Sequence, residues 1–270
     1  MPYKSILVHV DTGAAGERRL ALAASLAERH NAHLIGLSVV LPPTWGGIAG
    51  MPQLVLEIEK ANQEYFDACR ALFQQATESR AEDSEFRFRL STVRATLTEE
   101  SAFADLVVVS DTTGEPYEES SFNADDAILS SSAPVLVLPH NMEQTFDPKT
   151  VFIAWKPTRE AARAVRDALP ILREAEEVVA CVVAPDEASG RAARLEDVGV
   201  YLERHGVTAE AREVSPEGSV GRTIIDMAEK AGADLIVAGG YGHAPLREWL
   251  MGGVTEALLH HSPIPCLISH

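Results

Sequence analysis

The chain has 270 residues, 46% of them hydrophobic and 23% charged, and a formal net charge of -17. This hydrophobic content is that of a globular protein, which excludes a disordered chain, and no apolar run approaches the roughly 18 residues of a membrane helix. The negative charge repels phosphate backbones and anionic lipid surfaces, so we expect neither nucleic acid nor membrane as a partner.

Two features bear on the cell compartment. The first residues lead directly into the strand-like run 5–10. No apolar segment is followed there by a small-residue cleavage site, so we expect no secretory signal. Three cysteines, Cys69, Cys181 and Cys266, are too few and too scattered for a disulfide framework or a metal site. A cytoplasmic location is therefore the expectation.

Strand-like and helix-like segments alternate along the whole chain. In the first half the pattern predicts strands at 4–10, 34–40, 85–90, 105–110 and 134–138, and helices at 15–30, 52–79, 95–103 and 122–131. In the second half it predicts strands at 150–155, 177–183, 208–214, 234–239 and 264–268, and helices at 159–173, 189–205, 219–231 and 246–261. Several strands are continuous apolar runs, as in parallel strands covered on both faces. The alternation predicts an α/β fold with open parallel sheets.

The second half of the chain repeats the first. Four segments recur in the same order, namely SILVHVD (5–11) as TVFIAWK (150–156), ADLVVV (104–109) as ADLIVA (233–238), DDAIL (125–129) as TEALL (255–259), and APVLVL (133–138) as IPCLIS (264–269). Four ordered matches indicate a duplication of one strand–helix unit.

The duplication predicts two domains joined by a short linker. We expect domains at 1–140 and 150–270, with a linker at 141–149 inside a polar, proline-bracketed segment. The copies differ mainly at the Gly/Pro-rich segment 42–52 of the first, which is interpreted either as a flexible flap or as an ordinary surface loop.

A glycine-rich loop (the glycine loop, residues 239–252) follows the fourth predicted strand of the second copy. It has the pattern G-x2-G-x9-G, with Gly239, Gly242 and Gly252 at the named positions, and Gly253 and Val254 then enter a helix. Ligands of open α/β sheets bind outside the carboxyl ends of the strands, where this loop lies. Glycines let backbone N–H groups approach a phosphate, and a helix start adds a second anion site. The alternative is that these glycines serve tight turns and close helix–strand packing.

The sequence contains no other recognisable phosphate-binding motif and no catalytic motif. There is no G-x4-G-K-[ST] loop and no G-x-G-x-x-G after the first strand, which excludes a P-loop NTPase and a Rossmann dinucleotide site. His243 follows Gly242 and would bind an anion better when protonated, or it is an ordinary loop histidine. No nucleophile and base occur in a recognisable catalytic context, so we expect no catalytic residues.

The strand ILVHVD and the segment ADLIVAGGYGHAPLREWLMGGVTEALL, closed by the strand PIPCLIS, resemble the universal stress protein family in its tandem form. The resemblance implies two five-stranded parallel domains flanked by helices, whose last strands, 134–138 and 265–269, pair antiparallel as an intramolecular pseudo-dimer. It also implies ATP binding through G-x2-G-x9-G-[Ser/Thr], with an Asp at the end of the first strand near the adenosine.

Both copies depart from that pattern. In the second, Gly253 replaces the hydroxyl residue and Lys156 replaces the Asp. The first keeps Asp11 but has other residues where the loop glycines and their neighbour would be: Ser110, Thr113, Phe122 and Asn123. One site, in the second domain, is therefore expected. The nucleotide-binding residues implied by loop and resemblance are Gly239, Gly242, His243, Gly252, Gly253, Val254, Lys156 and Val183.

The resulting hypothesis is a stress-response regulatory protein, not an enzyme, whose C-terminal domain binds an adenine nucleotide of the ATP or AMP class. No metal is expected beyond magnesium carried by the nucleotide, and pairing of two chains stays open. Two alternatives remain: a scaffold that binds no nucleotide and acts through dimerisation and protein partners, and a very weak ATP hydrolase.

Overall fold

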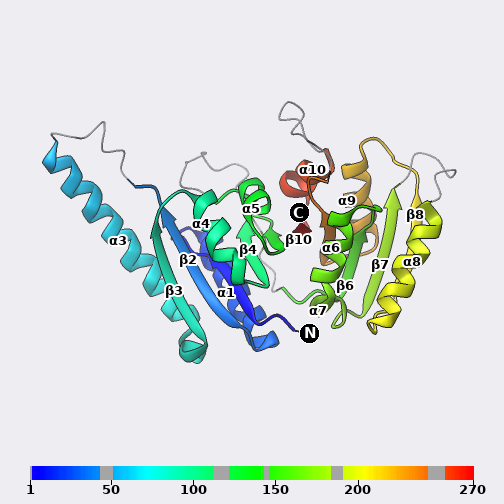
Figure 1. The fold of residues 1–270 in the computed structure, drawn as a ribbon, viewed down its shortest axis with the longest axis horizontal. Coiled ribbons are helices and arrows are strands. Elements are labelled where there is room, and N and C mark those ends of the chain that lie inside the picture. The colour runs from blue at the N-terminus through cyan, green and yellow to red at the C-terminus, as the bar shows by residue number, and fades with distance from the viewer. Residues whose placement is uncertain are drawn as a thin grey trace. The chain divides into compact units, whose positions relative to one another are not determined.

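The computed structural model describes residues 2–42, 51–111, 122–140, 142, 146–183, 191–242 and 253–270. By its contacts the chain divides into two compact units, Pro2–Ala133 and Pro134–His270. In each unit, strands lie side by side with helices on either side of the sheet (Figure 1). The predicted α/β class with parallel sheets flanked by helices is confirmed.

The N-terminal unit has a parallel sheet in the order β3-β2-β1-β4. Helix α1 contacts α3, and α4 contacts α5. Its strands are β1 (Ser5–His9), β2 (His33–Val40), β3 (Ser84–Leu90) and β4 (Leu106–Ser110). Its helices are α1 (Ala14–His30), α3 (Pro52–Ala76), α4 (Val93–Glu100) and α5 (Ala124–Ser130), with short 3-10 turns at Glu78–Asp83 and Ser101–Phe103.

The C-terminal unit has the strand order β5-β10-β9-β6-β7-β8, parallel except for β5. Its strands are β5 (Val135–Leu138), β6 (Thr150–Ala154), β7 (Glu177–Val183), β8 (Glu210–Val214), β9 (Leu235–Gly239) and β10 (Cys266–Ser269). Its helices are α6 (Arg159–Asp167), α7 (Leu169–Leu172), α8 (Arg191–Arg204), α9 (Val220–Lys230) and α10 (Gly253–His261).

The antiparallel pairing implied by the resemblance is present between β5 and β10. Leu136 lies opposite Leu267, and Val135 lies opposite Ile268. This pairing is the reason that β5 belongs by its contacts to the C-terminal unit. The domain boundary at 140 and the linker at 141–149 stay predictions.

The central strands form where the apolar runs predict them because both faces are covered. Ile6 and Val8 of β1 and Phe152 of β6 have no exposed surface. Polar caps begin several helices: Thr158 accepts from the backbone N–H of Ala161, and Ser219 accepts from that of Arg222. Such caps satisfy backbone donors that a helix start leaves unpaired.

Three predicted helices end or divide differently. The predicted helix 159–173 consists of α6 and α7, since Pro170 in the first turn of α7 has no N–H to continue a longer helix. The predicted helix 52–79 ends at Ala76, and 95–103 is α4 followed by a 3-10 turn. Residues 43–50 of the Gly/Pro-rich segment and the predicted helix start at 246 lie outside the described residues.

Within the described part of the chain, no helix is both long and apolar enough to cross a membrane.

Candidate functional site

The candidate site lies at the carboxyl ends of three neighbouring strands of the C-terminal unit, β9, β6 and β7 (the carboxyl edge). Ala154 of β6 pairs with Ala238 of β9 on one side and with Cys181 of β7 on the other. Gly239 and Val183 end their strands, and Lys156 follows β6. The structure therefore brings these three predicted site residues to one edge. Val183 is half-buried and Lys156 is exposed.

The described part of the glycine loop, 239–242, is held by hydrogen bonds that its backbone N–H groups donate. The N–H of Gly240 donates to the carbonyl of Ser269 at 2.9 Å, which ties the loop to β10. The N–H of Tyr241 donates to the Thr255 hydroxyl at 3.4 Å, which ties it to the first turn of α10. Tyr241 has φ 51°, a left-handed conformation uncommon outside glycine. The loop thus turns directly towards the start of α10.

The start of α10 presents the second half of the predicted phosphate site. Gly253 is its first residue and is exposed, and a Cβ added there would meet no atom within 4 Å. Val254 is half-buried. Gly221 of α9 allows the close approach, because a Cβ on it would lie 2.8 Å from the Gly253 carbonyl oxygen. The predicted residues His243 and Gly252 lie outside the described residues.

Two of the glycines in the described part of the loop, Gly239 and Gly242, also have close neighbours in the packing. A Cβ on Gly239 would lie 2.5 Å from the backbone nitrogen of Ala161, so the end of β9 must be glycine for α6 to begin beside it. A Cβ on Gly242 would lie 2.8 Å from a carboxylate oxygen of Glu160. The packing alternative therefore accounts for Gly239, whereas at Gly242 the close neighbour is a side chain.

Glu160 places a carboxylate beside the glycine loop, a contact that was not predicted from the sequence. Its side chain is 5% exposed and accepts a hydrogen bond from Arg159 Nε at 2.5 Å. Burial raises the pKa of this carboxyl, but the hydrogen bonds from Arg159, its own backbone and Thr158 lower the pKa by more than burial raises it. The group is therefore ionised. An acidic residue in a first helical turn is common, and so the sequence carried no signal of this contact.

In the N-terminal unit the equivalent edge is filled by a buried arginine and its partners. Arg19, 3% exposed, donates to the His9 carbonyl at 2.8 Å, to the Ser110 hydroxyl at 2.9 Å and to the Asp11 carboxylate at 2.5 Å. Asp11 also accepts from the N–H of Gly13 at 3.0 Å. Asp11, the carboxylate that the resemblance places near an adenosine, is thus already bound by Arg19 and Gly13 of its own domain.

An aromatic stack closes the same edge. The rings of His9 and Phe122 lie 4.0 Å apart, inclined by 16°, and both residues are buried. Burial and the Arg19 charge lower the pKa of His9 to about 3 against the opposing effect of Asp11, so His9 is neutral and its 3.4 Å contact with Asp11 is no ion pair. Burial raises the pKa of Asp11, but Arg19 and the other hydrogen-bond partners lower it more.

The family model for universal stress proteins matches residues 2–139 and 148–270. The chain belongs to the universal stress protein family. Two matches in one chain mean two tandem universal stress protein domains, as the duplication predicts. No curated protein matches the sequence.

Solved structures show the same fold over nearly the whole chain. A universal stress protein from Archaeoglobus fulgidus DSM 4304 has a TM-score of 0.75 at 15% identity, covering 98% of this chain and 95% of its own. A putative universal stress protein from Pseudomonas aeruginosa UCBPP-PA14 has a TM-score of 0.62 at 16% identity, covering 99% and 93%. A functionally unknown protein from Pseudomonas aeruginosa PAO1 has a TM-score of 0.60 at 16% identity, covering 99% and 92%.

Neither universal stress protein domain shows a metal centre in its described part, where no three His, Cys, Asp or Glu side chains gather closely enough to hold an ion. The three cysteines are buried and free. Burial raises the pKa of Cys181 to about 11 and that of Cys266 to about 12, so both thiols are protonated.

Proposed function

We propose that this universal stress protein binds one adenine nucleotide, of the ATP or AMP class, at the carboxyl edge of its C-terminal domain. The phosphates lie between the glycine loop and the start of α10, where backbone N–H groups and the positive end of the helix dipole attract anions. The hydrogen bond from the Tyr241 N–H to the Thr255 hydroxyl supports this placement because it holds the glycine loop beside the first turn of α10.

The difference between the two domains carries the proposal. In the N-terminal domain the buried guanidinium of Arg19 is paired with Asp11, and Phe122 packs on His9. At the C-terminal edge, Gly253 faces open space and Lys156 is exposed. The edge with glycines and an open helix start accommodates an anion, and the filled edge does not.

The nucleoside end would lie towards Val183 and Lys156. Val183 is a half-buried apolar residue at the end of β7, suited to contact a base. The Lys156 ammonium has donors only, so it serves a phosphate or a ring nitrogen where the resemblance implies a carboxylate acceptor. Lys156 also offsets part of the net charge of -17, which opposes an anionic ligand.

Isothermal titration of the full chain with ATP, ADP and AMP tests the proposal. We expect one site per chain, lost in Gly242→Val because the added side chain fills the space between the loop and Glu160. Gly199→Val is the matched control, since an added Cβ there meets no atom within 4 Å and the residue belongs to α8. The absence of binding at millimolar nucleotide would refute the proposal.

One observation favours the scaffold alternative, in which the site has lost its ligand. The ionised Glu160 carboxylate beside Gly242 repels a phosphate at short range. Under this alternative the melting temperature stays unchanged with any nucleotide, and Glu160→Gln does not alter that result. Under the nucleotide proposal, Glu160→Gln tightens ATP binding.

A further inference from the structure

Strand β3 is the last strand of the sheet in the N-terminal unit, and within the described part of the chain it pairs only with β2 (Figure 1). Helix α3 lies over β2 rather than over the outer edge of β3. Phe73 of α3 packs on Gly36 of β2, where an added Cβ would lie 2.4 Å from the ring. The Cys69 thiol lies 3.8 Å from the carbonyl oxygen of Val10, just beyond β1. A seven-residue edge strand is thus open to pairing with another strand.

The backbone groups of alternate β3 residues point away from the sheet. The N–H of Ser91, just after the strand, donates to the Val40 carbonyl of β2 at 3.0 Å. The odd-numbered residues of β3 therefore direct their N–H and C=O groups towards β2, and the even-numbered residues direct theirs outwards. In agreement, the carbonyl of Phe88 accepts a hydrogen bond from the exposed side chain of Arg89 at 3.2 Å. The outward residues are Ser84, Phe86, Phe88 and Leu90.

The sequence of β3, SEFRFRL, is complementary to itself when two copies run antiparallel about Arg87. Glu85 of each copy then lies opposite Arg89 of the second copy on one face of the sheet. Phe86 lies opposite Phe88 of the second copy on the other face, and both have outward backbone groups, as a hydrogen-bonded pair requires. Opposite charges and aromatic rings in such cross-strand positions stabilise a sheet.

The charges at the centre of this pairing balance within each chain. Two copies of Arg87 face each other at the two-fold axis, and like charges there oppose pairing. Each Arg87 is already bound in its own chain by Glu85 and by Glu100, with 2.5 Å between Arg87 Nη1 and Glu100 Oε2. Arg89 also binds Glu100, at 2.7 Å. These four side chains have a net charge of zero in a chain of net charge -17, so two such clusters meet without net repulsion.

A hollow of about 490 Å³ (the edge hollow) lies between α3 and β3. Ser84, Glu85 and Phe86 all line it, and neighbouring strand residues point to opposite faces, so the hollow borders the outer edge of the strand. Phe73 of α3 lines its apolar side. In the antiparallel register, Leu90 of the second copy lies opposite Ser84, beside this hollow. Leu90 is 56% exposed, and the hollow would remove its side chain from water.

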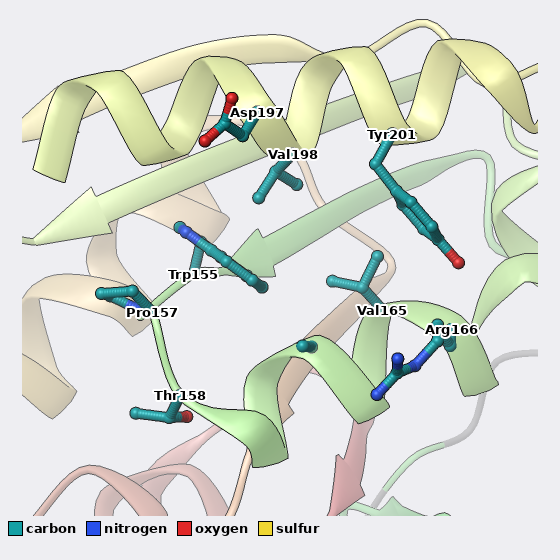
Figure 2. Close-up of a pocket in the computed structure, with 9 residues that line it drawn as sticks. Trp155, Pro157, Thr158, Val165, Arg166, Asp197, Val198 and Tyr201 are labelled. Atoms are coloured by element: carbon teal, nitrogen blue, oxygen red, sulfur yellow. The ribbon is translucent and has the colours of Figure 1, made fainter.

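The corresponding edge strand of the C-terminal unit, β8, lacks both features. Its sequence is EAREV, and an antiparallel pairing about Arg212 would place Glu210 opposite Val214, without an ion pair. A hollow of that unit lies between α6 and α8, where Figure 2 shows Trp155 and Val198, and no described residue of β8 lines it. The self-complementary edge is therefore that of β3.

We propose that two copies of this chain pair through β3, antiparallel and about a two-fold axis at Arg87, so that the sheets of two N-terminal domains become continuous. The contact uses the same surface on both copies. Each copy places Leu90 in the edge hollow of the other, and each Glu85 binds Arg89 of the second copy. The pairing does not depend on nucleotide binding in the C-terminal domain.

Sedimentation equilibrium of the full chain tests the pairing, from about 5 µM to about 1 mM because small interfaces belong to weak complexes. We expect a reversible equilibrium between one chain and two. Glu85→Arg sets arginines opposite each other and Arg89→Glu sets glutamates opposite each other, so each variant alone should associate at least about tenfold more weakly. An equimolar mixture of the two variants restores opposite charges at both positions, and it should associate about as tightly as the unaltered chain. Glu213→Arg, the same charge change on β8, is the control and leaves association unchanged.

Leu90→Ala tests the edge hollow with little risk to the fold, because the side chain is exposed in the single chain. Two leucines are lost from each pair, so we expect association to weaken about tenfold or more. Val200→Ala, at a residue of α8 that is 46% exposed, is the matched control.

Amide hydrogen exchange detects the pairing without any substitution. The outward N–H groups of Phe86, Phe88 and Leu90 should exchange more slowly in concentrated than in dilute protein, whereas the N–H of Arg87, which faces β2, changes little. Equal exchange of the outward amides at both concentrations would overturn the proposal. So would a chain that stays single at every concentration, association that survives both charge reversals or Leu90→Ala, or a mixture of the two charge variants that does not associate.

Discussion

At Gly253, substitution by serine adds one hydroxyl group and so tests whether a phosphate binds at this position. The position is exposed, and a Cβ would meet no atom within 4 Å, so Gly253→Ser fits without strain. The serine hydroxyl stands at the start of α10 and donates to a phosphate. A hydrogen bond to a charged group contributes about 1.5 kcal/mol or more, so we expect ATP to bind about tenfold more tightly by isothermal titration.

The matched control for that substitution is Gly199→Ser. Gly199 lies within α8, and its added Cβ also meets open space. This variant should leave the ATP affinity unchanged. An ATP affinity for Gly253→Ser that equals that of the control would place the phosphates elsewhere.

His9 makes the stability of the N-terminal domain depend on pH. Its pKa falls from 6.5 when unfolded to about 3 when folded. Between these values only the unfolded state binds the proton, so stability is highest above pH 6.5 and decreases as the pH falls towards 3. One proton corresponds to a slope of at most about 1.4 kcal/mol per pH unit. The pKa of Asp11 is lowered from 3.8, so the stability that this carboxylate contributes is lost only as the pH falls towards and below 3.8, at the acid end of that window.

Urea denaturation of the full chain at a series of pH values measures this slope. His9→Phe retains a ring to stack on Phe122 and removes the titrating group. We expect the variant to lose less stability than the unaltered chain between about pH 6.5 and 4.5. Parallel curves for the two proteins would show that His9 does not account for the dependence.

At the scale of elements, the packing of α6 on the end of β9 depends on Gly239. A Cβ added at Gly239 would lie 2.5 Å from the backbone nitrogen of Ala161. The backbone at a helix start cannot move aside as a flexible side chain can. Gly239→Ala is therefore expected to lower the free energy of unfolding by about 1–3 kcal/mol, the usual effect of overpacking.

Gly242→Ala is the comparison within the same loop. The atom nearest to its added Cβ belongs to the flexible Glu160 side chain, so we expect less than half the loss of Gly239→Ala. Chemical denaturation of both variants gives the two values. Equal losses would mean that the position of the Glu160 side chain is as rigid as the backbone of α6.

Elements that depend on local pattern were predictable from the sequence, whereas contacts between elements were not. Continuous apolar runs indicated the central strands, and the glycine spacing located the loop after β9. The break between α6 and α7 was predictable from Pro170, which cannot continue a helix, but the helix predicted at 159–173 did not take this proline into account. Glu160 beside Gly242 and the cavity beside Trp155 had none, because both arise only when α6 packs against its neighbours.

At the scale of the whole molecule, the sequence repeat predicted two copies of one domain. It did not predict with which copy the strand Val135–Leu138 makes its contacts. The strand Val135–Leu138 closes the first copy in sequence, yet it pairs with β10 of the second. Alternating strands and helices indicate order along the chain, and they contain no information on antiparallel partners. That pairing was available only from the family resemblance.

The pairing predicts how the C-terminal unit responds to truncation. All four residues of β5 are buried, with at most 3% exposed. A fragment of residues 134–270 should therefore be more stable than one of residues 141–270, by about 3 kcal/mol or more, because the second lacks the buried apolar side chains of β5 and leaves the edge of β10 unpaired. Urea denaturation of the two fragments measures the difference. Equal stabilities would instead support a C-terminal domain that begins after residue 140.

The central claim is that one nucleotide binds to a chain with two homologous domains. A crystal structure of the full chain grown with ATP tests it most directly. We predict difference density for one nucleotide per chain, with its phosphates between Gly242 and Gly253. Density beside Asp11 in the N-terminal domain, or none at either carboxyl edge with ATP at millimolar concentration, would contradict the account.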